Sequence, residues 1–238
     1  FISFGEDHVV LKKILCTDVC HFDLKKSHFE NLLSETDRLG WKRTMTRPIF
    51  RYTPDETVLI AHHLDATPFI VMHITPTRRR WTFPIPRWKK VIDQTRSFIP
   101  EATIILTGSH DDFGFIEELA SLCADTRVKN YAGRLTPTEL LSVIHYSKLY
   151  IGVETGITHL ASMMGRPSLV IGHSAAPSWL PTYAPGTIVV RNMEKCVCVG
   201  NGTFTCIAEQ DGKQYTQCTL YITDEMVSNG LEELLGRK

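Results

Sequence analysis

The chain contains 238 residues, 43% of them hydrophobic and 22% charged, which indicates a folded protein of one large domain or two small ones. Lysine plus arginine and aspartate plus glutamate number 26 each, so the chain lacks the basic excess that drives nucleic-acid binding. No apolar run is long enough to predict a transmembrane helix, and seven cysteines in no secreted-scaffold pattern favour a reducing cytoplasm. Because the sequence begins at Phe1 without a signal-peptide pattern, we expect a piece of a longer protein.

Residues 1–62 carry the least regular pattern of the chain. Residues 9–15 fit a helix or a strand equally well. Residues 27–40 predict a helix, residues 47–54 a proline-punctuated connector, and residues 55–63 a short helix. The apolar face predicted for the first of these helices consists of Phe29, Leu32, Leu33, Thr36 and Leu39.

From residue 68 onward, short apolar runs alternate with helical patterns. Thr136 and Glu139 form a predicted capping box, with Pro137 at the first helical position. This alternation predicts an α/β fold, a Rossmann-like parallel sheet with helices on both faces. The predicted strands are residues 69–73, 103–107 and 128–131, and the predicted helices are residues 86–98, 112–124 and 136–147.

Residues 149–172 predict a tight unit of strand, turn, helix and strand. The strand covers residues 149–153, the turn is Glu154-Thr155-Gly156, and Gly165 with Pro167 ends the helix before a strand at residues 168–172. The free N–H groups at the start of the helix face the carboxyl edge of the sheet, where they suit an anion and above all a phosphate.

Side chains of this unit are candidate ligand contacts. Gly156 allows a ligand to approach the backbone closely, and Thr155 can cap the helix or donate its hydroxyl to a phosphate oxygen. His159 lies one helical turn further on and faces the same opening. Thr155 also has an ordinary explanation as a plain N-cap, and His159 as a core histidine.

Two more loops follow predicted strands and therefore reach the same edge of the sheet. The loop at residues 75–81 carries three consecutive arginines, which can clamp a diphosphate or equally form a solvated basic stretch. Gly108 and Ser109 are small enough to admit a nucleoside base or ribose, although an ordinary turn capped by Ser109 explains them better.

The C-terminal part predicts a loop at residues 173–181, a strand at residues 187–190 and a helix at residues 223–235. Between the last two lies a polar excursion that carries four cysteines. They could supply thiolates for a structural Zn²⁺, but the spacing matches no standard finger, so free thiols or one disulfide are favoured and no metal is predicted. These cysteines are Cys196, Cys198, Cys206 and Cys218.

The turn and helix at residues 154–167 resemble a known signature. Glu154-Thr155-Gly156, then His159 and Ala161, then Gly165-x-Pro167, are similar to the Asp-Thr-Gly-x-x-His-x-Ala…Gly-x-Pro pattern of glycosyltransferase family nine, the heptosyltransferases. Glu154 stands where that family usually has Asp. The arginine loop also resembles the family's Thr or Ser, basic residue, Trp and Pro, and the resemblance covers residues ~63–235.

The resemblance implies a GT-B type C-terminal domain at residues 63–238, preceded by a remnant of the N-terminal acceptor domain and connector at residues 1–62. It implies no cofactor, because the nucleotide-sugar donor is a substrate, and it implies that the catalytic base belongs to the N-terminal domain. The donor-binding residues that we predict from these patterns and the resemblance are Thr75, Thr77, Arg79, Arg80, Gly108, Ser109, Leu135, Glu154, Thr155, Gly156 and His159.

The implied activity is transfer of a sugar, ADP-heptose being the expected donor, with inversion onto a lipopolysaccharide core. The implied partner is a lipid-linked oligosaccharide acceptor at the inner membrane surface, met by a cytoplasmic or peripheral enzyme. Two alternatives remain open at this point. One is a nucleotide-sugar binding module without catalysis, and the other is a different GT-B enzyme such as a sugar-nucleotide epimerase.

Overall fold

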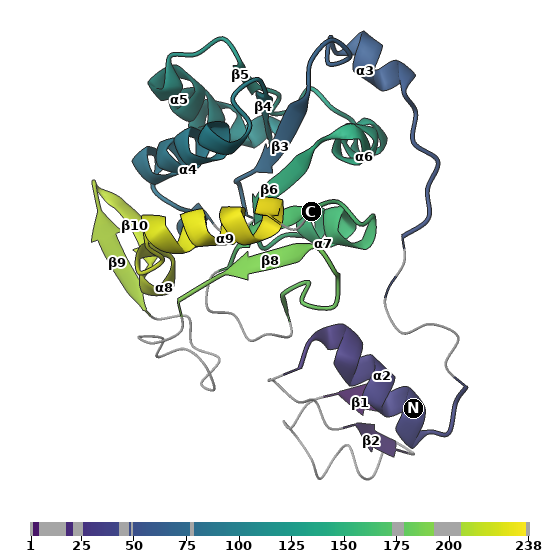
Figure 1. Ribbon diagram of the computed structural model, residues 1–238. Helices are drawn as coiled ribbons and strands as arrows, with labels where there is room; N and C mark the ends of the chain where they lie inside the picture. The colour runs from purple at the N-terminus through teal and green to yellow at the C-terminus, as the bar shows by residue number, and fades with distance from the viewer. Residues whose placement is uncertain are drawn as a thin grey trace.

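Figure 1 shows the computed structural model of the chain, which describes residues 2–4, 18–20, 26–42, 48, 50–76, 79–172, 179–192 and 206–236. The N-terminal elements are β1 (Ile2–Phe4), β2 (Asp18–Cys20), α2 (His28–Arg38) and α3 (Thr57–Ala61). The main sheet contains β3 (Phe69–His73), β4 (Thr103–Thr107), β5 (Val128–Asn130), β6 (Leu149–Val153), β7 (Ser168–Ile171) and β8 (Thr187–Val190). Its connections are η1 (Arg79–Trp81), α4 (Ile85–Phe98), η2 (His110–Asp112), α5 (Phe113–Cys123), α6 (Pro137–Tyr146) and α7 (Gly156–Met163). The chain continues through β9 (Ile207–Gln210), β10 (Lys213–Thr216), α8 (Gln217–Leu220) and α9 (Asp224–Gly236).

The six strands of the main sheet are all parallel and lie in the order β5-β4-β3-β6-β7-β8. From β3 the chain builds outward through β4 and β5, and it then returns to the other side of β3 and builds outward through β6, β7 and β8. This is the strand order of a doubly wound Rossmann sheet, and the order reverses between β3 and β6. The predicted α/β fold with a parallel sheet is confirmed.

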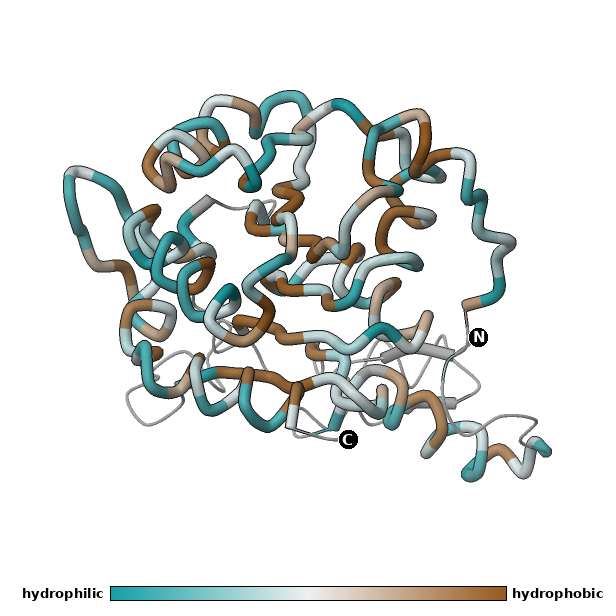
Figure 2. Tube along the Cα trace, turned by 45° about the horizontal axis from the view of Figure 1, so that its top comes forward, coloured by the Kyte–Doolittle hydropathy of each residue, from teal (hydrophilic) through white to brown (hydrophobic). Residues whose placement is uncertain are grey.

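Each face of the sheet packs against its own set of helices. Alternate residues of β3 point to opposite faces, so Ile70 and Met72 join the core under α4, α5 and α9, whereas Phe69 and Val71 join the core under α3, α6 and α7. The strands β3 and β4 are buried along their whole length, as a parallel sheet covered on both faces requires. Hydrophobic segments accordingly run through the middle of the molecule and hydrophilic ones around it (Figure 2).

Local sequence signals place most helix ends correctly. Thr136 and Glu139 form the predicted capping box at the start of α6, and Ser27 and Glu30 form another at the start of α2. Gly165 adopts a φ of 76° after α7, the left-handed conformation that ends a helix and that glycine tolerates best.

The apolar face predicted for α2 is wrong in part. Leu32 is 52% exposed, whereas the polar residues Asn31 and Glu35 are buried. The reason is visible in the hydrogen bonds, because the Asn31 amide donates to the carbonyl of Ser27 at 3.0 Å and Glu35 accepts from Arg38 at 2.6 Å. Polar side chains whose hydrogen bonds are made within the protein can be buried, even where the hydrophobic pattern predicts that their apolar neighbours are buried instead.

The segment at residues 55–63 also forms a shorter helix than predicted. Only Thr57–Ala61 is helical, and His63 has a φ of 55°, a conformation that cannot continue a helix.

The polar excursion that carries Cys206 and Cys218 contains an antiparallel hairpin of β9 and β10, which the sequence analysis missed. Asp211 and Gly212 connect its strands with φ values of 53° and 70°. An Asp-Gly pair between strands is the signal of a two-residue hairpin turn, so the sequence did contain the necessary information. Among the described residues, no helix is long and apolar enough to cross a membrane.

Candidate functional site

The loops that follow β3 and β6 begin side by side. His73 pairs with Gly152 across the two strands, so Thr75 and Glu154 each lie two residues beyond the same pair. This is where the strand order reverses, and in open α/β sheets ligands bind in the crevice outside the carboxyl ends of the strands at such a point. The topology therefore places the start of the arginine loop, at Thr75, beside the Glu154-Thr155-Gly156 turn.

The start of α7 is capped and anchored from within the domain. Thr155 is its N-cap, and its hydroxyl oxygen accepts from the N–H of Thr158 at 3.4 Å. The Thr158 hydroxyl donates in turn to the carbonyl of Val153 and contacts the buried hydroxyl of Tyr150 at 2.9 Å. The turn before the helix is therefore fixed by side chains that lie beneath it.

The outer side of the same turn is open. A Cβ built on Gly156 would meet nothing within 4 Å, and the first N–H groups of α7, those of Gly156 and Ile157, form no hydrogen bond within the described part of the chain. A ligand can therefore reach two main-chain donors at the positive end of a helix.

The arginine loop supplies a positive charge to this edge. Arg80 belongs to η1, and its Nε atom is buried without a hydrogen-bond partner among the described residues. A buried guanidinium N–H without a hydrogen-bond acceptor destabilises the fold unless a ligand supplies the acceptor. The backbone of Arg79 opens η1, whereas Thr77 lies outside the described residues.

Asp112 ties the loop after β3 to the loop after β4. One oxygen of its carboxylate, Oδ2, accepts hydrogen bonds from the Thr75 hydroxyl at 3.0 Å and from the N–H and hydroxyl of Ser109 at 2.7 Å each. Because Thr75 and Ser109 both donate to Asp112, neither hydroxyl can donate its proton to a ligand at the same time. Asp112 was not among the predicted site residues, although Ser109-x-x-Asp112 matches a helix-start pattern.

Beneath this network lies a buried histidine at the end of β3. His73 is 9% exposed, and its Nδ1 atom lies 3.0 Å from the Thr107 hydroxyl. Burial lowers the pKa of His73 to about 4, and Asp112 offsets only part of that effect. The ring is therefore neutral at pH 7 and acts as part of the scaffold under the loops.

The loops after β4 and β5 pack directly against each other. The N–H of Gly133 donates to the carbonyl of Gly108 at 3.0 Å, and a Cβ on Gly133 would lie 2.9 Å from the Cα of His110. A Cβ on Gly108 would lie 2.8 Å from the Ile116 side chain, so its small size serves packing inside its own turn. Leu135 is half-buried and packs against the core under α6.

His159 uses both of its ring nitrogens inside the protein. Its Nδ1 atom lies 2.8 Å from the Tyr183 hydroxyl, and its Nε2 atom lies 3.0 Å from the carbonyl oxygen of Trp179. Burial lowers the pKa of His159, while the Trp179 carbonyl and the charge of Glu154 act in the opposite direction. Tyr183 was not predicted for this site, and no local pattern in the sequence marks it.

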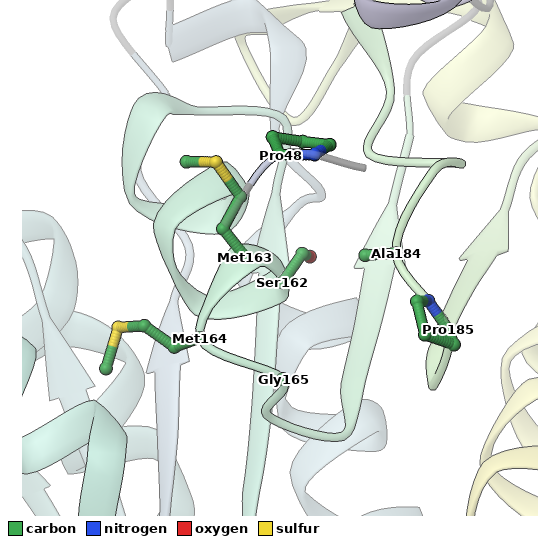
Figure 3. Close-up of a pocket in the computed structure, with 7 residues that line it drawn as sticks. All are labelled: Pro48, Ser162, Met163, Met164, Gly165, Ala184 and Pro185. Carbon is green, nitrogen blue, oxygen red and sulfur yellow. The ribbon is translucent and has the colours of Figure 1, made fainter. Parts of the chain in front are cut away.

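A cavity of about 150 Å³ lies at the C-terminal end of α7 (Figure 3). Since α7 has eight residues, the cavity and the turn are separated by about 12 Å along the helix axis. Of the predicted donor-binding residues that the structure describes, none lines this cavity. Its lining residues are Pro48, Ser162, Met163, Met164, Gly165, Ala184 and Pro185.

Within the described residues, no group of three or more His, Cys, Asp or Glu side chains is placed to hold a metal ion. Cys206 and Cys218 are buried and form no disulfide with each other. Cys196 and Cys198 lie outside the described residues, so the four-cysteine arrangement considered from the sequence stays a hypothesis.

The strand order and the loops at its point of reversal define the class of the domain. The chain contains a Rossmann-like α/β domain of the GT-B type. The family model described as glycosyltransferase family 9 (heptosyltransferase) matches residues 28–203. The chain belongs to that family, which confirms the resemblance found in the sequence.

Individual relatives are distant. The chain is 24% identical over 157 residues to lipopolysaccharide heptosyltransferase 3 of Escherichia coli, covering 64% of this chain and 46% of that protein. The structure matches a glycosyltransferase family 9 protein of Veillonella parvula with a TM-score of 0.73 and 17% identity, over 100% of this chain and 68% of that one. It matches E. coli ADP-heptose lipopolysaccharide heptosyltransferase II with a TM-score of 0.66 and 16% identity, over 84% of this chain and 56% of that one. The chain thus spans about half the length of the two E. coli relatives.

Proposed function

We propose that this chain binds the nucleotide-sugar donor of a heptosyltransferase, with the donor's diphosphate over the N-terminus of α7. The observation that carries the proposal is the open turn at Gly156, where the N–H groups of Gly156 and Ile157 form no hydrogen bond within the described residues. An anion at a helix N-terminus gains from both the N–H groups and the helix dipole. Arg80 supplies a charge-assisted donor to the same diphosphate.

ADP-heptose is the donor that best fits the family. Heptosyltransferase II of E. coli carries that sugar nucleotide in its name, and the resemblance of this chain to the family includes its donor-site signature. We infer that the loops after β4 and β5, which contain Ser109 and Leu135, receive the nucleoside. Glu154, one methylene longer than the family's usual Asp, is the residue that we propose to meet the sugar.

The proposed reaction is an inverting displacement onto a hydroxyl of a lipopolysaccharide core. The hydroxyl oxygen attacks the anomeric carbon, the bond from that carbon to the diphosphate oxygen breaks, and the diphosphate leaves with the electron pair. The N–H groups of α7 and Arg80 stabilise the charge that grows on the diphosphate, which lowers the barrier because the donors are already in place. No metal ion or cofactor enters this scheme.

We propose further that residues 63–238 form the donor-binding domain and that residues 1–62 belong to the acceptor domain and the connector, of which α3 packs against the core of the main sheet. The two-stranded sheet of β1 and β2, which is separate from the main sheet, is consistent with that division. The general base that takes the proton of the acceptor hydroxyl is assigned to the acceptor domain. The acceptor is proposed to be a lipid-linked oligosaccharide that a cytoplasmic enzyme meets at the inner membrane surface.

The test is isothermal titration of the 238-residue chain with ADP and ADP-heptose, with UDP and GDP for comparison. We expect saturable binding of ADP and ADP-heptose that Arg80→Ala weakens. Arg127→Ala is the matched control, because Arg127 precedes β5 at the opposite edge of the sheet and pairs with Asp125 there. Absence of binding by any of these nucleotides would refute the proposed function.

Turnover separates the proposed enzyme from a binding module or an epimerase. With the acceptor base assigned to the other domain, the chain alone should bind ADP-heptose but transfer heptose no faster than background hydrolysis, since a positioned base contributes roughly 10²–10⁴-fold. NMR analysis of the products would reveal an epimerised sugar nucleotide, which would favour the epimerase. Robust transfer by the chain alone would contradict the assignment of the base.

A further inference from the structure

Tyr183 lies between two parts of the molecule that are far apart in sequence. On its inner side, its ring stacks on His159 with a centroid separation of 6.0 Å and an interplanar angle of 22°. On its other side it contacts Phe29 of α2, with a centroid separation of 5.9 Å. Tyr183 follows the segment after β7, and His159 lies on α7 one turn beyond the open N-terminus at Gly156.

The two hydrogen bonds of His159 determine its protonation. The carbonyl oxygen of Trp179 can only accept, so Nε2 must carry a proton and donate it. In the neutral ring Nδ1 then has a free lone pair, which accepts from the Tyr183 hydroxyl at 2.8 Å. Burial raises the pKa of Tyr183 to about 12, so the phenol keeps the proton that this bond requires. The same burial effect keeps His159 neutral against the charge of Glu154.

We propose that Tyr183 is a positioning residue of the donor site, whose hydroxyl donates to Nδ1 of His159 and thereby ties the 179–183 segment to α7. This inference rests on the proposed function, because it concerns the site over the N-terminus of α7. Both ring nitrogens of His159 are used by the protein, so His159 affects the donor through the segment that it holds rather than by a hydrogen bond to the diphosphate.

The proposal assigns a role to the histidine of the family signature that the spacing in sequence cannot reveal. The pattern places His159 on the same helix face as the phosphate-binding turn, which suggests a ligand contact. The structure instead gives its ring two protein partners from one segment 20 to 24 residues further along the chain. In this proposal, the N-terminus of α7 faces the donor, and His159 in the next turn holds the 179–183 segment.

The first test is the tautomer of His159, measured by ¹⁵N–¹H NMR correlation through the imidazole ring. In the unsubstituted chain we expect the Nε2–H form with a hydrogen-bonded Nδ1. In Tyr183→Phe, which keeps the aromatic ring, Nδ1 should lose its hydrogen-bond shift, while the Trp179 carbonyl keeps the proton on Nε2. The control is Tyr146→Phe, since the Tyr146 ring contacts His145 at 4.9 Å but its hydroxyl forms no hydrogen bond within the described residues. An Nδ1–H tautomer, or a Tyr183→Phe spectrum identical to that of the unsubstituted chain, would overturn the proposal.

The second test is a double-mutant cycle on ADP affinity, measured by titration calorimetry. Tyr183→Phe and His159→Ala should each weaken ADP binding roughly three- to tenfold, the worth of one lost hydrogen bond. The double variant should bind no more weakly than His159→Ala alone, because both changes release the same segment. If the two effects multiply, His159 contacts the ligand independently and the proposal is wrong.

The two tests separate the inference from the proposed function. If the unsubstituted chain binds no ADP, the proposed function fails, whereas the NMR comparison of Tyr183→Phe with Tyr146→Phe still decides whether Tyr183 fixes His159. If ADP binds and Tyr183→Phe changes neither the spectrum nor the affinity, the inference fails and the proposed function stands.

Discussion

Substitution of Gly156 should affect stability and nucleotide binding in opposite ways. Gly156 is the first residue of α7, its φ is not positive, and an added Cβ would lie in open space. The fold therefore gives no reason for a glycine at this position. A diphosphate over the N-terminus of the helix would occupy that space, so the absence of a side chain serves the ligand.

The expected magnitudes follow from this geometry. Gly156→Ala should raise the free energy of unfolding by about 0.5 kcal/mol, because the unfolded chain loses freedom and no atom is displaced. Gly156→Val should prevent the diphosphate from reaching the N–H groups of Gly156 and Ile157. Loss of two charge-assisted hydrogen bonds costs at least about 3 kcal/mol, which is a factor of about 150 in the dissociation constant of ADP.

Gly230→Ala is the matched control, since Gly230 is also helical but sits against the sheet. Its added Cβ would lie 2.7 Å from Val190 Cγ2 and 2.9 Å from Leu169 Cδ1. Overpacking of this kind costs about 1–3 kcal/mol, so Tm should fall by several degrees. Differential scanning calorimetry and isothermal titration with ADP measure both quantities. Normal ADP affinity in a folded Gly156→Val variant would refute the placement of the diphosphate.

Three other outcomes are expected from the site and its scaffold. Arg80→Ala should weaken ADP binding about ten- to hundredfold in titration calorimetry, and Arg79→Ala much less, because the buried Nε of Arg80 has no hydrogen-bond partner among the described residues. Equal effects would contradict the choice of Arg80. Asp112→Asn should lower the free energy of unfolding by about 1–2 kcal/mol in urea titrations, since one oxygen accepts three hydrogen bonds, whereas Asp111→Asn on the same exposed turn should be neutral. The pKa of His73 is about 4 in the folded state, below its ordinary 6.5, so the unfolded state binds the proton first as pH drops. The free energy of unfolding should therefore fall by up to about 3 kcal/mol between pH 6.5 and pH 4. If a His73→Gln variant loses stability with the same dependence on pH, other groups cause the loss.

The elements of the main sheet were predictable because their signals are local. Strands from Phe69 to Val190 are apolar runs bounded by turn residues, and the ends of α6 and α7 carry the capping box at Thr136 and the glycine at Gly165. The strand order was not predictable in this way, because it depends on contacts between residues that lie far apart in sequence. It is the strand order that makes the loops after β3 and β6 neighbours.

The roles of individual site residues were harder to predict for the same reason. A sequence can show that Thr75, Ser109 and His159 stand at the correct edge, but it cannot show which partners their polar atoms choose. The Thr75 hydroxyl finds Asp112, a residue 37 positions away, and the ring of His159 finds Tyr183, 24 positions away. The α2 helix illustrates the same limit, since its buried Asn31 and exposed Leu32 depend on hydrogen bonds that a hydrophobic pattern does not record.

The hydrogen-bond partners of the site residues indicate which ligand groups the site can bind. Thr75, Ser109 and His159 all direct their polar atoms to other protein groups, so in this edge of the sheet they serve to hold loops in place. The donors that form no hydrogen bond within the described residues include the first N–H groups of α7 and the Nε atom of Arg80. Main-chain N–H groups and a guanidinium are donors only, and all of them suit an anion. These donors favour a diphosphate, and in the proposed reaction they favour the departing diphosphate most, as its charge grows, whereas the Glu154 carboxylate of the same turn is the acceptor proposed to meet the sugar.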